Sequence, residues 1–114
     1  MGGRRSENTC ITENKIFDGR CEGIFLLNSC ESWILRNEIY GNYEGIVMVT
    51  SIPLIENNDI HHNKSIGIMI LKNSKPKLLK NQINHNRIIG LFIRDNSSGY
   101  IKDNVVTFFI YILR

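Results

Sequence analysis

Asparagine recurs along this chain at a nearly constant spacing, and this period constrains the fold more than any other feature. An aliphatic residue stands two positions after each of these asparagines, and another stands three positions before it. A period of roughly 20–50 residues is typical of proteins built by stacking one small structural unit. We therefore interpret the chain as about five copies of one unit. The asparagines lie 23, 21, 23 and 23 residues apart, at Asn14, Asn37, Asn58, Asn81 and Asn104.

Other residue types repeat in the same register, and they show what each unit is made of. Each unit contains short apolar stretches of strand length, rich in β-branched residues and separated by turn-forming residues. No stretch of ten residues has the 3.6-residue period of a helix. Further columns are glycine followed by an aliphatic residue at 23–24, 45–46, 67–68 and 90–91, serine at 6, 29, 51, 74 and 97, and asparagine at 42, 63 and 86.

Strands this short can bury a core only if they are wound into coils that stack about 4.8 Å apart. The sequence thus predicts an all-β, right-handed parallel β-helix of about five coils of 22–23 residues, with the aliphatic columns inside. We expect the asparagines at bends, where they tolerate a left-handed backbone and bond to the next coil. We expect the glycines where a Cβ would clash. The expected divisions are a tail at 1–5, coils near 6–28, 29–50, 51–73, 74–96 and 97–106, and a divergent end at 107–114.

A leucine-rich repeat is the rival repeat architecture. Residues 34–39 fit the L-x-x-N-x-L part of its consensus. The preceding L-x-x-L spacing is absent, and the segment after Ile39 is a poor helix. The β-helix is therefore favoured.

The units at 14–24 and 58–68 resemble the N-x-I-x-x-N-x-x-x-G-I coils of right-handed β-helix repeat proteins of the pectate-lyase-like superfamily. Residues 51–55 and 74–78 resemble the S-x-P-x-I link between such coils. Within the superfamily, the chain is most similar to the β-helix of F-box ubiquitin-ligase substrate receptors, and next to the spindle proteins that bind the Shc adaptor. The resemblance implies a protein-binding role. No F-box precedes the coils, so the ligase-adaptor role does not carry over whole.

The repeat fails after Val106. It predicts an asparagine near 109 and a glycine near 113, but residues 107–114 are apolar and high in β-propensity. Solenoids need polar caps, and an apolar strand edge promotes association. We therefore expect a coil that is incomplete or weakly capped at this end, as in a fragment or truncated product, with self-association through it. The alternative is that residues 108–113 fold back as a final strand.

Strand alternation predicts an apolar stripe on the outside of the coils. The residues expected inside are Ile24, Leu26, Ile46, Met48, Ile68, Ile70, Leu91 and Ile93. The residues expected outside form one column of Phe25, Val47, Met69 and Phe92, beside a second column of Leu27, Val49 and Leu71 that ends in Arg94. An exposed apolar stripe indicates either a surface for a protein partner or one covered by another element of a longer parent chain.

Polar columns are weaker candidates for function. The column Glu13, Arg36, Asn57, Lys80 and Asp103 is expected to be a solvated face. His61, His62 and His85 lie on neighbouring coils, with His62 and His85 in register. They are only a weak candidate for a metal site, because zinc needs three or four ligands in a tetrahedron. We predict no metal and no cofactor.

A non-enzymatic protein-binding scaffold is the function that the sequence favours. β-helices that process acidic polysaccharides use clustered carboxylates and a base. Here Glu38 and Asp59 are the one near pair, with no obvious base beside them. The alternative is a carbohydrate-binding or polysaccharide-processing β-helix, with Trp33, Tyr40 and Tyr43 as stacking platforms.

Composition narrows the setting. The net charge of +3 is too small and scattered to indicate nucleic-acid binding. No apolar run reaches the ~20 residues of a membrane span, and the N-terminus lacks a signal peptide. An odd number of cysteines, Cys10, Cys21 and Cys30, predicts reduced thiols and a cytoplasmic or nuclear location. Gly2 and Ser6 fit the N-myristoylation pattern, which leaves acylation open.

Overall fold

The structure is a computed structural model that describes residues 9–29, 31–107 and 109–113. The expected tail at 1–5, the acylation pattern at Gly2 and Ser6, and Cys30 lie outside the described residues. The described chain contains fifteen strands and no helix. The predicted all-β fold is therefore confirmed.

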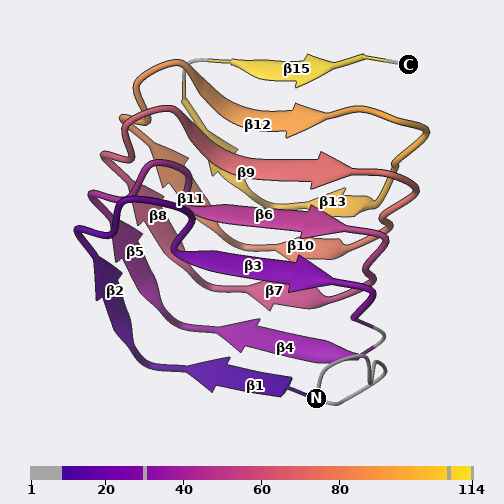
Figure 1. Cartoon of the computed structure of the whole chain (residues 1–114), viewed down its shortest axis with the longest axis horizontal. Coiled ribbons are helices and arrows are strands. Elements are labelled where there is room, and N and C mark those ends of the chain that lie inside the picture. Colours follow the sequence, from indigo (N-terminus) through magenta and orange to yellow (C-terminus); the bar gives the residue numbers. More distant parts are fainter. Residues whose placement is uncertain (1–8, 30, 108, 114) are drawn as a thin grey trace.

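Three parallel sheets of five strands each make up the molecule, which we name A, B and C. Each coil contributes one strand to each sheet, so a strand pairs with its equivalents one coil before and after (Figure 1). Sheet A contains β1 (Thr9–Thr12), β4 (Ser32–Leu35), β7 (Leu54–Glu56), β10 (Lys77–Leu79) and β13 (Tyr100–Lys102). Sheet B contains β2 (Lys15–Phe17), β5 (Glu38–Tyr40), β8 (Asp59–His61), β11 (Gln82–Asn84) and β14 (Val105–Val106). Sheet C contains β3 (Ile24–Leu27), β6 (Ile46–Val49), β9 (Ile66–Leu71), β12 (Ile89–Ile93) and β15 (Ile110–Ile112).

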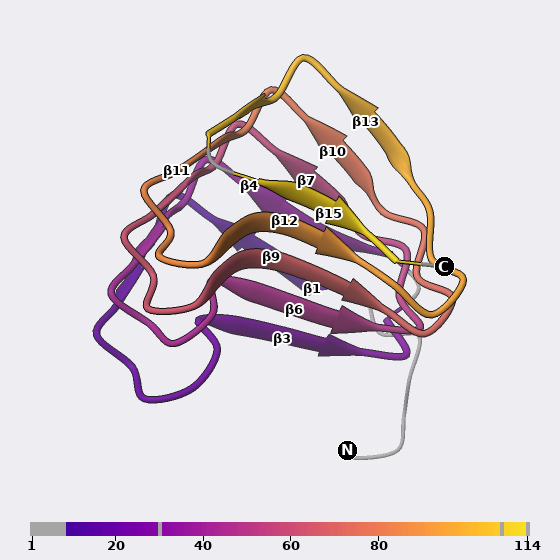
Figure 2. The same ribbon diagram turned by 90° about the horizontal axis from the view of Figure 1, so that it is seen from above.

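The interior is filled by aliphatic side chains in columns. Figure 2, which looks down on the stack, shows sheets A and C on separate sides of the coil. Ile34 of sheet A, Ile39 of sheet B and Ile46 of sheet C are fully buried, and their equivalents on the next two coils are too. Burying each such side chain contributes about 1.5–3 kcal/mol. All eight residues expected inside from strand alternation belong to this core.

Each corner of the coil contains a residue with positive φ, and in most coils the residue that follows turns a polar side chain inward. Between sheets A and B, the left-handed residues are Glu13, Arg36, Asn57, Lys80 and Asp103, with φ of 55–60°. The expectation that the ladder asparagines themselves are left-handed is wrong, because the residue before each of them takes that conformation. The asparagine returns to the ordinary region, and this directs its amide into the turn. Asn37, Asn58 and Asn81 are accordingly buried.

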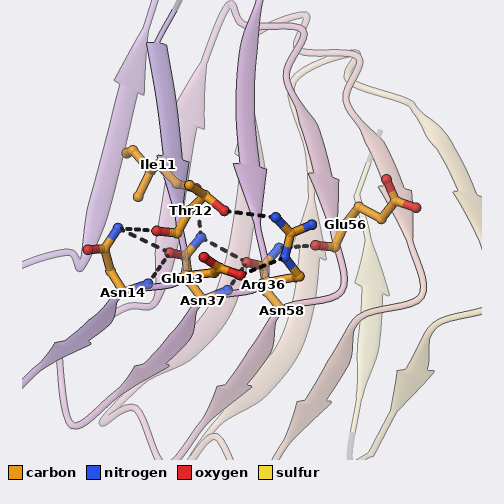
Figure 3. A network of polar contacts seen from close by, with 8 residues as sticks. All are labelled: Ile11, Thr12, Glu13, Asn14, Arg36, Asn37, Glu56 and Asn58. Atoms are coloured by element: carbon orange, nitrogen blue, oxygen red, sulfur yellow. Dashed lines mark hydrogen bonds and ion pairs between the residues drawn. The ribbon is translucent and has the colours of Figure 1, made fainter.

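The buried amides bond across three successive coils, as Figure 3 shows for Asn14, Asn37 and Asn58. Nδ2 of Asn37 donates to Oδ1 of Asn58 at 3.0 Å and to the carbonyl of Ile11 at 2.9 Å. The backbone N–H of Asn37 donates to the same Oδ1 at 2.8 Å. The ladder thereby satisfies polar groups that the turn buries.

The two other corners use the same device. Oδ1 of Asn63 accepts the backbone N–H of Asn42, and Oδ1 of Asn86 accepts that of Asn63, each at 3.1 Å. At the corner after sheet C, Oγ of Ser74 accepts the backbone N–H of Ser51 at 3.0 Å. The second asparagine column and the serine column are therefore corner ladders too.

The glycine column provides clearance between coils. A Cβ on Gly45 would lie 2.5 Å from the carbonyl oxygen of Gly67, and a Cβ on Gly67 would lie 2.6 Å from that of Gly90. Neither glycine has a positive φ. Glycine is needed here because adjacent backbones approach closely, as the sequence predicted.

The divergent end continues the stack. Leu91, Phe92 and Ile93 pair with Ile110, Tyr111 and Ile112, so β15 adds a rung to sheet C, as in the alternative of a final strand. Above this last coil no further described strand follows. Ile101, Ile110 and Ile112 are therefore 40–53% exposed, whereas Leu78 and Leu91 one coil below are fully buried. This end is weakly capped, as expected.

Candidate functional site: the outer face of sheet C

The outer face of sheet C carries two columns of apolar side chains. The strand register places Phe25 beside Val47, Val47 beside Met69, and Met69 beside Phe92. The column then continues to Tyr111 on β15, which lies in the segment where the sequence repeat fails. Leu27, Val49 and Leu71 form the second column.

Exposure varies along these columns more than alternation alone predicts. Phe25 and Leu27 are 51% and 57% exposed. Val47 is 5% exposed and Phe92 is 8% exposed, although both point outward. Val47 lies between the larger side chains of Phe25 and Met69. The Phe92 ring is covered by the stacked ring of Tyr111 and by the Arg94 guanidinium. Met69, Val49 and Leu71 are intermediate.

At the first coils, the accessible apolar side chains of this face are thus Phe25 and Leu27. Both lie on β3, where Ile24 and Leu26 alternate with them and are buried on the opposite face. Their positions are therefore fixed by the core and by the backbone pairing with β6. A partner would meet these side chains without first ordering the strand.

A second accessible apolar area lies at the other end of the same face. Tyr111 stacks on Phe92, with ring centroids 5.4 Å apart and an interplanar angle of 4°. An open depression of about 270 Å³ is lined by Ile88, Ile89, Phe109 and Tyr111. The sequence did not reveal this depression, because Phe109 and Tyr111 lie in the segment where the sequence repeat fails.

Charged residues border the face. Glu22 and Glu44 come directly before the glycines that precede β3 and β6, and the backbone carbonyl of Glu44 accepts the N–H of Gly23 at 2.9 Å. Burial, reinforced by the charge of Glu22, raises the pKa of the Glu44 carboxyl. At the far edge, the Arg94 guanidinium lies 5.9 Å from the Phe92 ring centroid. Nε of Arg94 also lies 3.4 Å from Oδ2 of Asp95. The face is therefore acidic where its first strands begin, and it carries an arginine–aspartate ion pair near Phe92.

The histidines lie on sheet B and its corner, away from this face. The rings of His62 and His85 stack at 5.0 Å, as their register predicted. Among the described residues, no set of three or more possible metal ligands includes His62 or His85. The structure brings together Glu38, Asp59 and His61, whose ligand atoms lie within 4.8 Å of one another. Asp59 and His61 stand two positions apart in one strand, so strand alternation could have predicted that they lie on the same face.

The three candidate aromatic platforms lie in different parts of the coil. Trp33 is on sheet A, Tyr40 is on sheet B and Tyr43 is in the turn before sheet C. Both faces of the Tyr40 ring are covered, by Phe17 at 5.2 Å and by His61 at 5.1 Å. These residues therefore form no continuous surface for a sugar.

The charged column beside the asparagine ladder is solvated. Nε of Arg36 lies 3.4 Å from Oε2 of Glu13, and the two side chains are 55% and 69% exposed. An exposed pair of this kind contributes about 0–1 kcal/mol. Cys10 and Cys21 are exposed free thiols.

Three parallel sheets wound into successive coils, with an amide or hydroxyl ladder at each corner, define the class of parallel β-solenoids. A family model for the right-handed β-helix region matches residues 3–108, and the chain belongs to this family. No curated protein and no solved structure matches the chain significantly. Within the part of the chain that the structure describes, no helix is long and apolar enough to span a membrane.

Proposed function

We propose that this chain is a non-enzymatic protein-binding scaffold, and that an apolar segment of a protein partner binds to the outer face of sheet C. The observation that carries the proposal is the exposure of Phe25 and Leu27, at 51% and 57%, on a strand whose inner face is fully packed. Large apolar side chains exposed on a rigid sheet are typical of interaction surfaces.

The geometry favours a protein over a small ligand. Hot spots of protein interfaces are few, and large aromatic side chains dominate them. Phe25 provides such an anchor at one end of the face, and the depression beside Tyr111 provides another at the far end. The half-buried Met69 and Leu71 between them are flexible apolar side chains that adapt to a partner's shape.

The charges at the border favour one orientation of the partner. Glu22 and Glu44 would attract basic residues near the start of β3, whereas Arg94 near Phe92 already pairs with Asp95. Complementary charges at an interface chiefly set specificity and association rate. We therefore expect an apolar partner segment that carries basic residues at the end that meets Glu22 and Glu44.

The resemblance to F-box receptors supplies the cellular context of the proposal. In that context the partner is a protein to be ubiquitinated, and the Shc-binding spindle proteins are the second choice. The exposed free thiols of Cys10 and Cys21 fit a reducing cytoplasm or nucleus. A carbohydrate-binding role has less support, because the aromatic side chains proposed for it do not share a surface.

Peptide-display selection on the immobilised chain tests the proposal, followed by affinity measurements on the selected peptides. Phe25→Ser and Leu27→Ser should each weaken binding at least about tenfold, since hot-spot residues cost about 2 kcal/mol or more when truncated and tenfold corresponds to about 1.4 kcal/mol. Phe17→Ser is the matched control, because Phe17 is 52% exposed on sheet B. Equal losses in the control, or unchanged affinity in both sheet C variants, would exclude this face. Phe92→Ser is unsuitable, because Phe92 is buried and its loss would also destabilise the fold.

A further inference from the structure

Glu38, Asp59 and His61 form a compact group on the outer face of sheet B. The register pairs Glu38 on β5 directly with Asp59 on β8, and His61 follows Asp59 on the same side of β8. Nε2 of His61 lies 2.8 Å from Oε2 of Glu38. One ligand atom from each of the three residues lies within 4.8 Å of the other two.

We infer that these three residues form a binding site for a divalent transition-metal ion, with Zn²⁺ as the best fit. Zn²⁺ binds His nitrogen and carboxylate oxygen at about 2.0–2.2 Å, in a tetrahedron whose ligand atoms lie about 3.3–3.6 Å apart. The observed separations span this range, so small side-chain rotations bring the atoms into place. Two carboxylates balance the charge of the ion, and water fills the fourth position.

The surroundings of His61 provide an independent argument. Its Nδ1 lies 2.7 Å from Nδ1 of His62, so one of these nitrogens donates a proton and the other accepts it. When Nε2 ligates the metal, the ring proton is on Nδ1 and is donated to His62. Ligating histidines almost always donate their second ring N–H in this way, which fixes the tautomer.

Stacked rings also hold His61 and His62 in place. The Tyr40 ring stacks on that of His61 with centroids 5.1 Å apart and an interplanar angle of 5°. The His62 ring stacks on that of His85 at 5.0 Å. The imidazole is therefore pre-oriented, with its Nε2 toward the two carboxylates, and its side chain is only 18% exposed.

Metal binding would join two coils. Glu38 lies on β5 and the two other ligands lie on β8, so the ion bridges adjacent rungs of sheet B. The unfolded chain does not hold the three ligands together, and the ion therefore stabilises the folded state by mass action. The site is on a different sheet from the proposed protein-binding face, and its role would be structural.

Titration of the metal-free 114-residue chain with ZnCl₂ tests the inference. The titration uses Cys10→Ser, Cys21→Ser and Cys30→Ser together, because thiolates also bind zinc. Calorimetry should show one equivalent bound, thermal unfolding should shift to higher temperature, and NMR should show His61 protonated on Nδ1. The absence of saturable binding would overturn the inference.

Variants in the same background locate the ion. Glu38→Gln, Asp59→Asn and His61→Gln should each abolish binding, and His62→Asn should weaken it about 10–100-fold. Glu13→Gln is the control for the carboxylate variants, because Glu13 is an exposed carboxylate outside the ligand set. Binding that survives His61→Gln, or that is lost equally in Glu13→Gln, would contradict the assignment. Unchanged affinity in His62→Asn would overturn the role given to His62.

Discussion

Asn37 donates both its backbone N–H and its side-chain N–H to a single oxygen, Oδ1 of Asn58 on the next coil, at 2.8 and 3.0 Å. The same contact is repeated from coil to coil. In each coil the asparagine that makes it directly follows the left-handed residue of the corner. The two functions of the corner are thus divided between neighbouring residues. Turn geometry belongs to one residue and hydrogen bonding between coils belongs to the next.

Asn58 and Asn57 allow this division to be tested. Asn58→Ala leaves the N–H of Asn37 and the carbonyl of Ile34 without a partner in a buried corner. Because each unsatisfied buried group costs about 1–3 kcal/mol, we expect a loss of about 2–4 kcal/mol in the free energy of unfolding. Asn57→Gly is the control and should change it by less than about 1 kcal/mol, since glycine tolerates its φ of 58°. Urea denaturation measures both, and equal losses would refute the division.

Lys80 tests the cost of the left-handed corner itself. Its φ is 55° and its side chain is exposed, so backbone strain dominates the effect of a substitution. A left-handed backbone costs a non-glycine residue about 1–2 kcal/mol, and β-branching increases that cost. Lys80→Gly should therefore raise the free energy of unfolding by about 1 kcal/mol, and Lys80→Val should lower it. A stabilising valine would show that this strain is absent.

Gly45 tests the clearance between coils. A Cβ at this position would lie 2.5 Å from the carbonyl oxygen of Gly67, so Gly45→Ala must push two backbones apart. Overpacking of this kind costs about 1–3 kcal/mol, and we expect the thermal midpoint to fall accordingly. Gly19→Ala is a milder comparison, because its nearest contact would be a side-chain oxygen at 3.0 Å. An equal effect of the two substitutions would contradict the argument.

Glu44 makes the stability of the fold depend on pH. Its pKa in the folded state is raised above the ordinary value of 4.5, by burial and then by Glu22. The folded state therefore holds the proton more tightly, so stability decreases as the pH rises from 4.5 through the raised pKa. Glu44→Gln should be more stable than the unmodified chain at pH 7, with no such gain well below pH 4.5. Urea titrations at both pH values measure this difference. A gain in stability that does not depend on pH would show that it does not arise from the ionisation of Glu44.

The exposed core side chains at the last coil predict self-association of the 114-residue polypeptide. Ile110 and Ile112 are 53% and 50% exposed beside the unpaired edge of β15, which is a template for a second copy. Sedimentation should show association that increases with concentration and is lost in Ile112→Lys. Val105→Lys is the charge-matched control, because Val105 is 56% exposed on sheet B. A monomer at all concentrations would refute this prediction.

The sequence alone determined that the chain winds into stacked coils and which side chains fill their interior. The period places Ile34, Ile55 and Leu78 at equivalent positions, and the strand register pairs Ile34 with Ile55 and Ile55 with Leu78, which stacks them directly. Strand alternation then separates inward from outward residues. These features follow from local rules that each unit obeys separately, so they could be predicted without knowledge of its neighbours.

The tertiary structure decided what the neighbouring coils do to each side chain. Val47 points outward as predicted, yet flanking side chains bury it, and this follows from the sizes of residues about 22 positions away. The left-handed conformation falls on the residue before each ladder asparagine, because the amide must turn inward to reach the next coil. The contact between His61 and Glu38 also depends on the tertiary structure. The two side chains come from neighbouring coils, and no local sequence pattern specifies the rotamers that bring them together.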